Sequence, residues 1–136
     1  MLELSLPVDI ELPWHAIQLP ADEFLVCHGL AATSLHRVCV VNTQGQIVRS
    51  QGSGRGCGAE HFNVPCHLTI DRRTLSVFVA DYCNRRVTQL SLESLQYVRS
   101  VIDHVSSEPR RLHINNTTRC LYVAVADSVC VLRLGR

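Results

Sequence analysis

Two neighbouring segments decide the fold of this chain: FNVPCHLTID at positions 62–71 and VFVADYCNRRV at positions 77–87. The first segment has a proline before a run that alternates apolar and polar residues, which is typical of a strand. The second opens on a β-branched and aromatic run and continues into an Asp-Tyr-Cys-Asn turn. Asp and Asn side chains bond their own backbone in turns, so the two segments are predicted to be adjacent strands followed by a tight connection to a third strand.

Weaker copies of this unit lie on both sides of it. Segments that open on Pro13, Pro65 and Pro109 begin in similar ways, and Pro65 and Pro109 are 44 positions apart. The interval from Pro13 to Pro65 is 52 positions, and the excess falls in the longer loops of the first copy. A period of about 40–50 residues with several short strands is typical of propeller blades. We therefore predict three repeat units, at 13–51, 62–102 and 108–134.

The units are predicted to contain strands rather than helices, because their apolar residues recur every second position or in short continuous runs. The expected strands are 14–19, 23–28, 36–42 and 46–50 in the first unit, 66–71, 75–80, 86–92 and 95–101 in the second, and 110–115, 120–125 and 128–134 in the third. A further strand is expected over 2–6, where apolar and polar residues alternate. The third unit thus lacks a fourth strand, while the N-terminus carries an unassigned one.

The pattern resembles the NHL repeat, the four-stranded blade unit of a class of β-propellers, most strongly over 52–101. The glycine-rich stretch 52–58 is similar to the loop ahead of each blade, and Asp81 begins the family's turn between the second and third strands. The first unit is similar to the NHL regions of invertebrate tripartite-motif-like proteins. The resemblance implies an all-β partial β-propeller of three four-stranded blades. It also implies a structural role for Asp81, as a cap for turn N–H groups and an acceptor for a nearby guanidinium.

Three blades are too few to close a ring, and an open ring leaves unpaired strand edges. The N-terminal strand can complete the third blade of a second copy, so we expect a homodimer that closes a six-bladed ring about a twofold axis. The alternative is that the chain is part of a longer propeller. The residues expected at the contact between copies are apolar and come from the first and last strands: Leu2, Leu4, Leu6, Val129, Val131 and Leu132.

Propeller function usually lies in the loops at one end of the central channel. The second residue after each opening proline is His15, His67 or Arg111, and we expect these three at one level of the channel. Four more polar or aromatic residues near turns are expected to supply contacts: Trp14, Tyr82, Arg85 and Arg110. The sequence thus favours a non-enzymatic scaffold for a protein or peptide partner, with no catalytic residue, cofactor or metal.

An enzyme is one alternative. The stretch DYCNRR at 81–86 resembles a segment of the peptidyl-hydroxyglycine lyase, an NHL-type propeller that holds zinc through His. That resemblance gives Tyr82 the role of the lyase's Tyr and Cys83 that of a neighbouring disulfide Cys. Zinc needs about three His ligands at equivalent positions, and Arg111 stands where the third would be.

RNA binding is the other alternative, because some tripartite-motif NHL propellers bind RNA through a basic face. Arg pairs occur at 72–73, 85–86 and 110–111, in successive units. A pI of 7.7 and few aromatic residues are unlike a typical nucleic-acid-binding domain.

Composition gives the remaining expectations. The net charge of +1 provides no overall attraction to nucleic acid or membranes. Seven cysteines are an odd number, and no secretory signal precedes them, which favours reduced thiols. No apolar run approaches the roughly 18 residues that span a bilayer. We therefore expect a cytoplasmic protein with no membrane segment.

Overall fold

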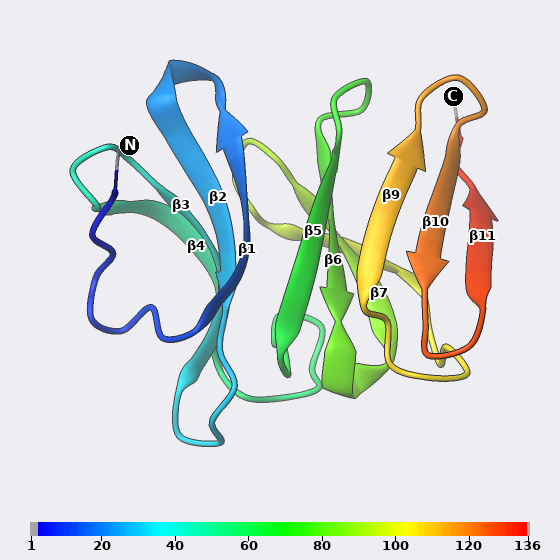
Figure 1. Ribbon diagram of the computed structural model, residues 1–136, viewed down its shortest axis with the longest axis horizontal. Helices are drawn as coiled ribbons and strands as arrows, with labels where there is room; N and C mark the ends of the chain where they lie inside the picture. The colour runs from blue at the N-terminus through cyan, green and yellow to red at the C-terminus, as the bar shows by residue number, and fades with distance from the viewer. Residues whose placement is uncertain (1–2, 136) are drawn as a thin grey trace.

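The chain folds as predicted into an all-β protein of three antiparallel sheets. The computed structural model describes residues 3–135, and Figure 1 shows the sheets side by side along the long axis. Sheet one contains β1 (Pro13–Leu19), β2 (Glu23–His28), β3 (Leu35–Val41) and β4 (Ile47–Gly54). Sheet two contains β5 (Pro65–Asp71), β6 (Ser76–Asp81), β7 (Arg86–Ser91) and β8 (Tyr97–Ile102), and sheet three contains β9 (Arg111–Asn115), β10 (Cys120–Ala124) and β11 (Val129–Arg133). The predicted strands of the three units are confirmed to within a few residues.

Two short 3₁₀ turns, η1 (Pro20–Asp22) and η2 (Tyr82–Asn84), are the helical elements among the described residues. No helix within residues 3–135 has the length and hydrophobicity needed to cross a bilayer.

The three sheets repeat one backbone pattern in one register. Ala16 pairs with Val26 in sheet one, Leu68 with Val79 in sheet two, and Leu112 with Val123 in sheet three. The residue before the second strand of each sheet has a positive φ, and these residues are Asp22, Leu75 and Arg119, with φ of 57°, 53° and 57°. The shared register makes position-by-position comparison between the sheets possible.

Apolar residues from adjacent sheets interleave in two clusters, one on each side of sheet two. The central strand β6 explains this arrangement, because every one of its residues is buried. Val77 and Val79 join the cluster with sheet one, whereas Phe78 and Ala80 join the cluster with sheet three. A strand buried on both faces has a continuous apolar run rather than a polar and apolar alternation, as the sequence of β6 has. The first strands β1, β5 and β9 lie next to one another.

A buried ion pair joins sheets two and three at the far end of β5. Arg119 donates from Nη1 to Oδ1 of Asp71 at 2.9 Å and from Nη2 to Oδ2 at 2.6 Å. This bidentate hydrogen bond lowers the pKa of the Asp71 carboxyl to about 2.

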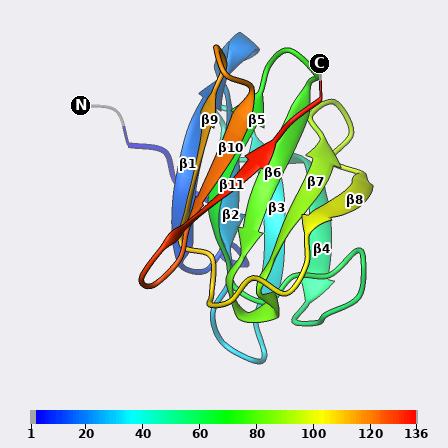
Figure 2. The same ribbon diagram turned by 90° about the vertical axis from the view of Figure 1, so that its right-hand side faces the viewer.

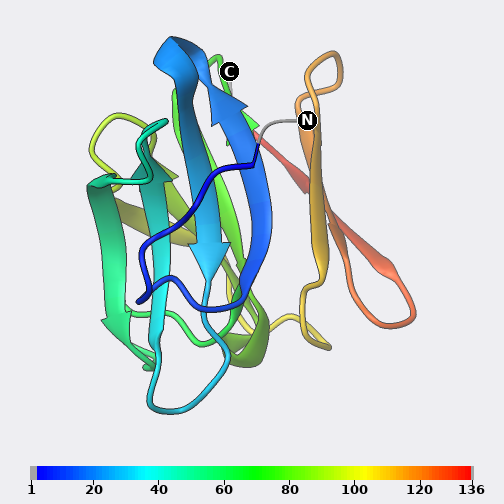
Figure 3. The ribbon, with the colours of Figure 1, turned by 60° about the vertical axis from the view of Figure 1, so that its left-hand side comes forward.

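The N-terminal segment corrects one prediction. A strand was expected over 2–6, but residues 3–7 form no strand, and Leu2 lies outside the described residues. Leu4, Leu6 and Ile10 instead pack against an apolar cluster on the face of sheet one that points away from sheet two. Figure 3 shows the segment crossing that face. The segment gains more from burying its leucines there than it would from an isolated, unpaired strand conformation.

The last strand is exposed on one side. Figure 2 shows β11 in front, at the end of the stack. Sheet three has the order β11-β10-β9, so β11 has no neighbour on its outer edge among the described residues. Val129 and Val131 are 59% and 60% exposed, while Leu132 is partly buried against the cluster shared with sheet two.

Candidate ligand-binding pocket

Two histidines link the first strands of the three sheets. Nδ1 of His15 on β1 accepts a hydrogen bond from the N–H of Leu68 on β5 at 3.2 Å. Nδ1 of His67 accepts one in the same way from the N–H of Leu112 on β9 at 3.0 Å. The rings stack with centroids 4.0 Å apart and planes 18° apart. The structure thus brings His15 and His67 together at one level, as the repeat spacing predicts.

Both histidines are neutral at pH 7. Burial, followed by the charges of His15 and Arg111, lowers the pKa of His67 to about 4. Burial and the charge of Arg111 also lower the pKa of His15. Because Nδ1 accepts a hydrogen bond in each ring, the proton of the neutral imidazole is on Nε2.

Arg111 holds the third equivalent position, since it pairs with Ala124 as His15 pairs with Cys27 and His67 with Ala80. Its side chain is exposed, and Nη1 donates to the carbonyl of Arg110 at 3.1 Å. Within residues 3–135 there is no cluster of three or more His, Cys, Asp or Glu suited to a metal ion. A guanidinium at the third position adds a positive charge where a zinc site needs a neutral or anionic ligand.

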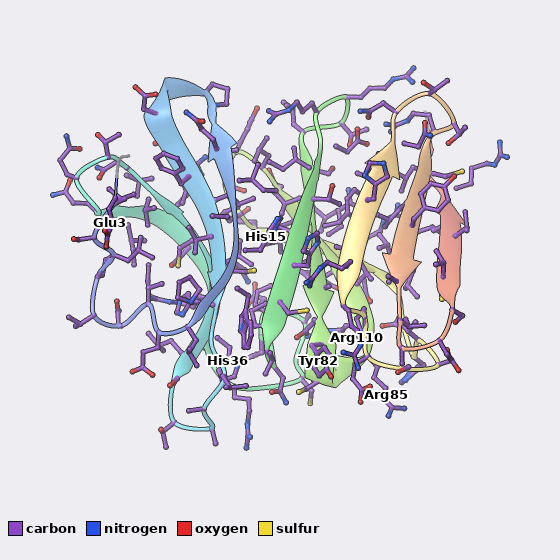
Figure 4. The ribbon with its side chains drawn as sticks, viewed as in Figure 1. Glu3, His15, His36, Tyr82, Arg85 and Arg110 are labelled. Atoms are coloured by element: carbon purple, nitrogen blue, oxygen red, sulfur yellow. The ribbon has the colours of Figure 1, made fainter. Side chains whose placement is uncertain are left out.

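A pocket of about 610 Å³ opens near Tyr82 and Arg110, at the end of the sheets where β5 begins. Four of the seven predicted binding residues line it. The full lining is Trp14, Leu30, Val64, Cys66, Tyr82, Cys83, Arg110, Arg111 and Ala124. We call it the Trp14–Tyr82 pocket. Figure 4 shows Tyr82, Arg85 and Arg110 gathered at this end, with His15 farther along the sheets.

The aromatic and cationic side chains of the pocket are held by specific contacts. Trp14 Nε1 donates to the carbonyl of Gly29 at 3.0 Å. The guanidinium carbon of Arg110 lies 5.7 Å from the centroid of the Tyr82 ring, within the range of a cation–π contact. Neither Arg110 nor Arg111 forms an ion pair with another residue in the described part of the chain. The pocket therefore presents two guanidinium groups without acidic partners beside two aromatic rings.

Arg85 lies at the same end but outside the pocket lining. Its Nη2 is 3.4 Å from Oε1 of Glu108, and its side chain is 54% exposed. Its backbone has a φ of 50°, the left-handed conformation that ends η2. Arg85 therefore borders the pocket rather than lining it.

A buried carboxylate fixes the turn that presents Tyr82. Asp81 is fully buried and accepts hydrogen bonds from Asn63 N–H at 2.7 Å, Asn84 Nδ2 at 2.8 Å and Arg86 Nε at 2.9 Å. Burial raises the pKa of the Asp81 carboxyl, and these donors oppose that rise. The predicted hydrogen bond from a nearby guanidinium to Asp81 is confirmed. The predicted capping of turn N–H groups is wrong, because the Asp81 side chain makes no capping hydrogen bond to η2.

Arg86 extends this network into the glycine-rich loop. Its guanidinium also donates to the carbonyls of Cys57, Gly58 and His61, at 3.0, 2.8 and 2.6 Å. The Arg86 guanidinium thus holds the loop by binding three of its backbone carbonyls. Its hydrogen-bond donors are used within the protein and are not available to a ligand.

The Arg pairs do not gather on one face. Arg72 and Arg73 lie in the β5–β6 turn, at the opposite end of β5 from Arg110 and Arg111. This separation gives the molecule no continuous basic surface through all three pairs.

Several pocket residues were not singled out from the sequence. Val64 has a φ of 61°, and its N–H donates to Nδ1 of the buried His36 at 2.9 Å. Cys66 donates from Sγ to the carbonyl of Pro109 at 3.4 Å, and burial raises the pKa of its thiol to about 11. Leu30 and Ala124 complete the set of unpredicted lining residues, whereas Cys83 had been predicted only as the counterpart of the lyase's disulfide Cys. Only Cys66 had a sequence signal, its place directly before His67 in the repeat.

None of the seven cysteines, all of which lie in the described part of the chain, forms a disulfide.

Comparison with known proteins establishes the fold alone. No family model matches the sequence, and no curated protein is significantly similar to it. One similar solved structure is a Bacteroides fragilis protein described as a "Putative exported protein", with a TM-score of 0.65 and 14% identity over 96% of this chain. Another is a protein of unknown function from Bacteroides caccae, with a TM-score of 0.50 and 16% identity over 89% of this chain. The matches cover 36% and 44% of those two chains, so this chain spans less than half of each.

The comparison corrects one expectation. The sequence predicted a cytoplasmic location, and the description of the Bacteroides fragilis protein as exported contradicts it. The prediction failed because it depended on the absence of a secretory signal in the residues at hand. At 14% identity the likeness carries the all-β fold and nothing further about function.

Proposed function

We propose that the three sheets are blades of an NHL-type β-propeller and that the chain is a non-enzymatic binding scaffold. The Trp14–Tyr82 pocket is its binding site. The observation that carries the proposal is the convergence of Trp14, Tyr82, Arg110 and Arg111 on one pocket, although these residues come from three different sheets. Binding sites commonly combine apolar walls with a few convergent polar groups in this way.

The ligand class follows from the chemistry of the lining. Arg110 and Arg111 have no acidic partner in the described chain, and a guanidinium binds a carboxylate through two parallel hydrogen bonds. Leu30, Val64 and Ala124 provide apolar walls. Tyr and Trp are the residues that most often dominate binding energy at protein interfaces. We therefore assign the pocket to an acidic peptide segment in which an Asp or Glu neighbours an apolar side chain.

The test is a selection from a random heptapeptide display library on the full chain, followed by affinity measurement on the enriched peptides. We expect enrichment of Asp or Glu beside an apolar residue. Replacing Arg110 and Arg111 by Ala should weaken binding of these peptides at least about tenfold. The matched control replaces Arg72 and Arg73 by Ala, which removes the same charge from the opposite end of β5 and should leave affinity within about twofold.

Two outcomes would overturn this assignment. An equal loss in both double variants would mean that overall charge, rather than the pocket, drives binding. Tighter binding of a single-stranded oligouridine than of any peptide, with a steep decrease as salt rises, would favour the RNA alternative instead.

A further inference from the structure

Each end of the stack of sheets presents a face equivalent to one through which the sheets of this chain pack together. On β10, Tyr122 and Ala124 occupy the register positions of Leu25 and Cys27 on β2 and of Phe78 and Ala80 on β6. The four equivalent residues in sheets one and two are at most 2% exposed, because the next sheet covers them. Tyr122 and Ala124 are partly exposed.

The exposed valines of β11 extend this face. Val131 pairs with Tyr122 and Val129 with Ala124. Residues directly opposite each other in an antiparallel pair point to the same side of the sheet. Tyr122, Ala124, Val129 and Val131 therefore form one apolar patch, which we call the sheet-three face.

The opposite end of the stack carries the complementary positions. Phe24 and Val26 on β2 correspond to Val77 and Val79 on β6, which pack against the preceding sheet. Within residues 3–135 no sheet precedes sheet one. A groove of about 590 Å³ lies there instead, between the N-terminal segment and β1, and its lining includes Leu4, Leu6, Ala16, Phe24, Val26 and Val41. We call it the sheet-one groove.

The N-terminal segment lies where a neighbouring sheet needs one more strand. Residues 3–7 cross the outer side of the sheet-one groove, held there by Leu4 and Leu6 (Figure 3). Sheets one and two have four strands each, whereas sheet three has three within the described residues. A sheet three seated in the groove would bring the unpaired edge of β11 toward residues 3–7.

We propose that the sheet-three face of one copy packs into the sheet-one groove of a second copy, reciprocally, so that two chains form a closed dimer. The occupant is a second copy because the sheet-three face matches, position by position, the surfaces that sheets one and two present to their successors. The basic residue Arg111 lies on sheet three opposite Ala124, and the exposed acidic residues Glu3 and Glu11 lie in the segment leading to β1. Opposite charges at the two ends favour this pairing over a contact between two like faces.

The contact between copies would lack one hydrogen bond that is present at each contact between sheets within the chain. His15 and His67 each accept an N–H from the next sheet, whereas Arg111 at the third position has only donors. The contact between copies therefore depends on apolar burial, and it should be weaker than the contacts within the chain.

The experiment is light scattering of the full chain across a concentration series. We expect a mass of about twice 15.2 kDa for the unaltered protein. Val131→Asp should weaken the dimer at least about tenfold, because it places a charge in the centre of an apolar contact. The position is 60% exposed, so the variant should fold normally, which its far-UV circular dichroism will verify.

The matched control is Val98→Asp on β8, where the valine is 51% exposed and lies away from both faces. It should leave the dimer unchanged. A monomeric unaltered protein at about 100 µM, an equal effect of both substitutions, or an open series of larger species would each overturn the proposed dimer.

Discussion

The ring of His15 lies flat on the ring of His67, with centroids 4.0 Å apart. Each ring accepts a backbone N–H from the next sheet, so the pair replaces the ladder hydrogen bonds that separate sheets cannot form with one another. Stacking at this distance disfavours protonation of both rings together, since two imidazolium groups would repel. These histidines therefore serve first as connectors between sheets, and their Nε2–H groups remain as donors.

The first prediction concerns this pair and pH. The pKa of both histidines is lowered in the folded state, to about 4 for His67, from the ordinary value of 6.5. Below pH 6.5 the unfolded chain therefore binds more protons than the folded chain does. Stability should be fully present above pH 6.5 and should fall as pH decreases toward about 4. Replacing both histidines by Asn keeps an acceptor near the position of Nδ1 and removes the titration. We expect this variant to lose less stability than the unaltered chain between pH 7 and pH 4.5, as measured by urea unfolding.

The control for this experiment is already in the molecule. His28 is fully buried, and burial with the charge of Arg37 lowers its pKa to about 4 as well. His28 titrates in the same range in the unaltered protein and in the double Asn variant. The difference between their profiles of stability against pH therefore reports the contribution of the stacked pair. Identical profiles would show that the pair contributes nothing to the acid sensitivity.

A second prediction concerns the ion pair between sheets two and three. Asp71→Asn should lower the thermal midpoint by roughly 5 °C or more at pH 7, because the buried guanidinium of Arg119 then lacks its carboxylate. Asp127→Asn is the matched control, since Asp127 is exposed, and it should change the midpoint by less than about 1 °C. The lowered pKa of Asp71 determines how the difference in thermal midpoint between the unaltered protein and Asp71→Asn depends on pH. The stabilisation should be complete above about pH 4 and should be lost as pH falls through about 2.

A third prediction separates the charge of Arg86 from its geometry. Arg86→Lys keeps the positive charge beside Asp81 but cannot span three carbonyls of the glycine-rich loop. Amide hydrogen exchange over 55–61 should accelerate at least about tenfold, while the strands of sheet two stay protected. Arg86→Gln should in addition cost about 3 kcal/mol of unfolding free energy, because the Asp81 carboxylate is left buried without its cation.

The neighbouring residue supplies the control for this third prediction. Arg85→Lys changes an exposed side chain whose contact with Glu108 is 3.4 Å. Solvent screens an exposed ion pair, so this variant should exchange as the unaltered protein does. Equal acceleration in both variants would mean that Arg86 does not hold the loop.

The strands and the level of the two histidines could be predicted from the sequence, for a clear physical reason. Period-two alternation and continuous apolar runs depend on which faces of a sheet are buried, and both are visible in the residues themselves. The proline spacing placed His15, His67 and Arg111 in register, because each sheet repeats one backbone pattern. The contact between Asp81 and Arg86 was predictable in the same way, because the two residues are five positions apart.

The pocket and the N-terminal segment were less predictable because they depend on contacts between distant residues. Leu30 and Ala124 reach the Trp14–Tyr82 pocket from different sheets, and no local pattern marks them. The alternation over 2–6 does predict a strand, yet Leu4 and Leu6 find a better environment against sheet one. Arg85 and Arg86 look equivalent in the sequence, but only the register of the β6–β7 pair shows that Arg86 faces Asp81.

The last prediction concerns the contact between the N-terminal segment and the β3–β4 turn of sheet one. Gly45 lies in the β3–β4 turn with a φ of 77°, and a Cβ on this residue would run into the carbonyl oxygen of Ser5. Gly45→Ala should therefore both strain the turn, by about 1 kcal/mol, and push residues 3–7 away from sheet one. Hydrogen exchange over 3–10 should accelerate, and the dimer proposed above should weaken with it, because the displaced segment no longer borders the groove. Gly54→Ala is the matched control, since an added Cβ there meets no atom within 4 Å and its φ is not positive. If Gly45→Ala lowers stability without any change in exchange over 3–10, the segment is not held by this turn, and the turn strain alone accounts for the loss.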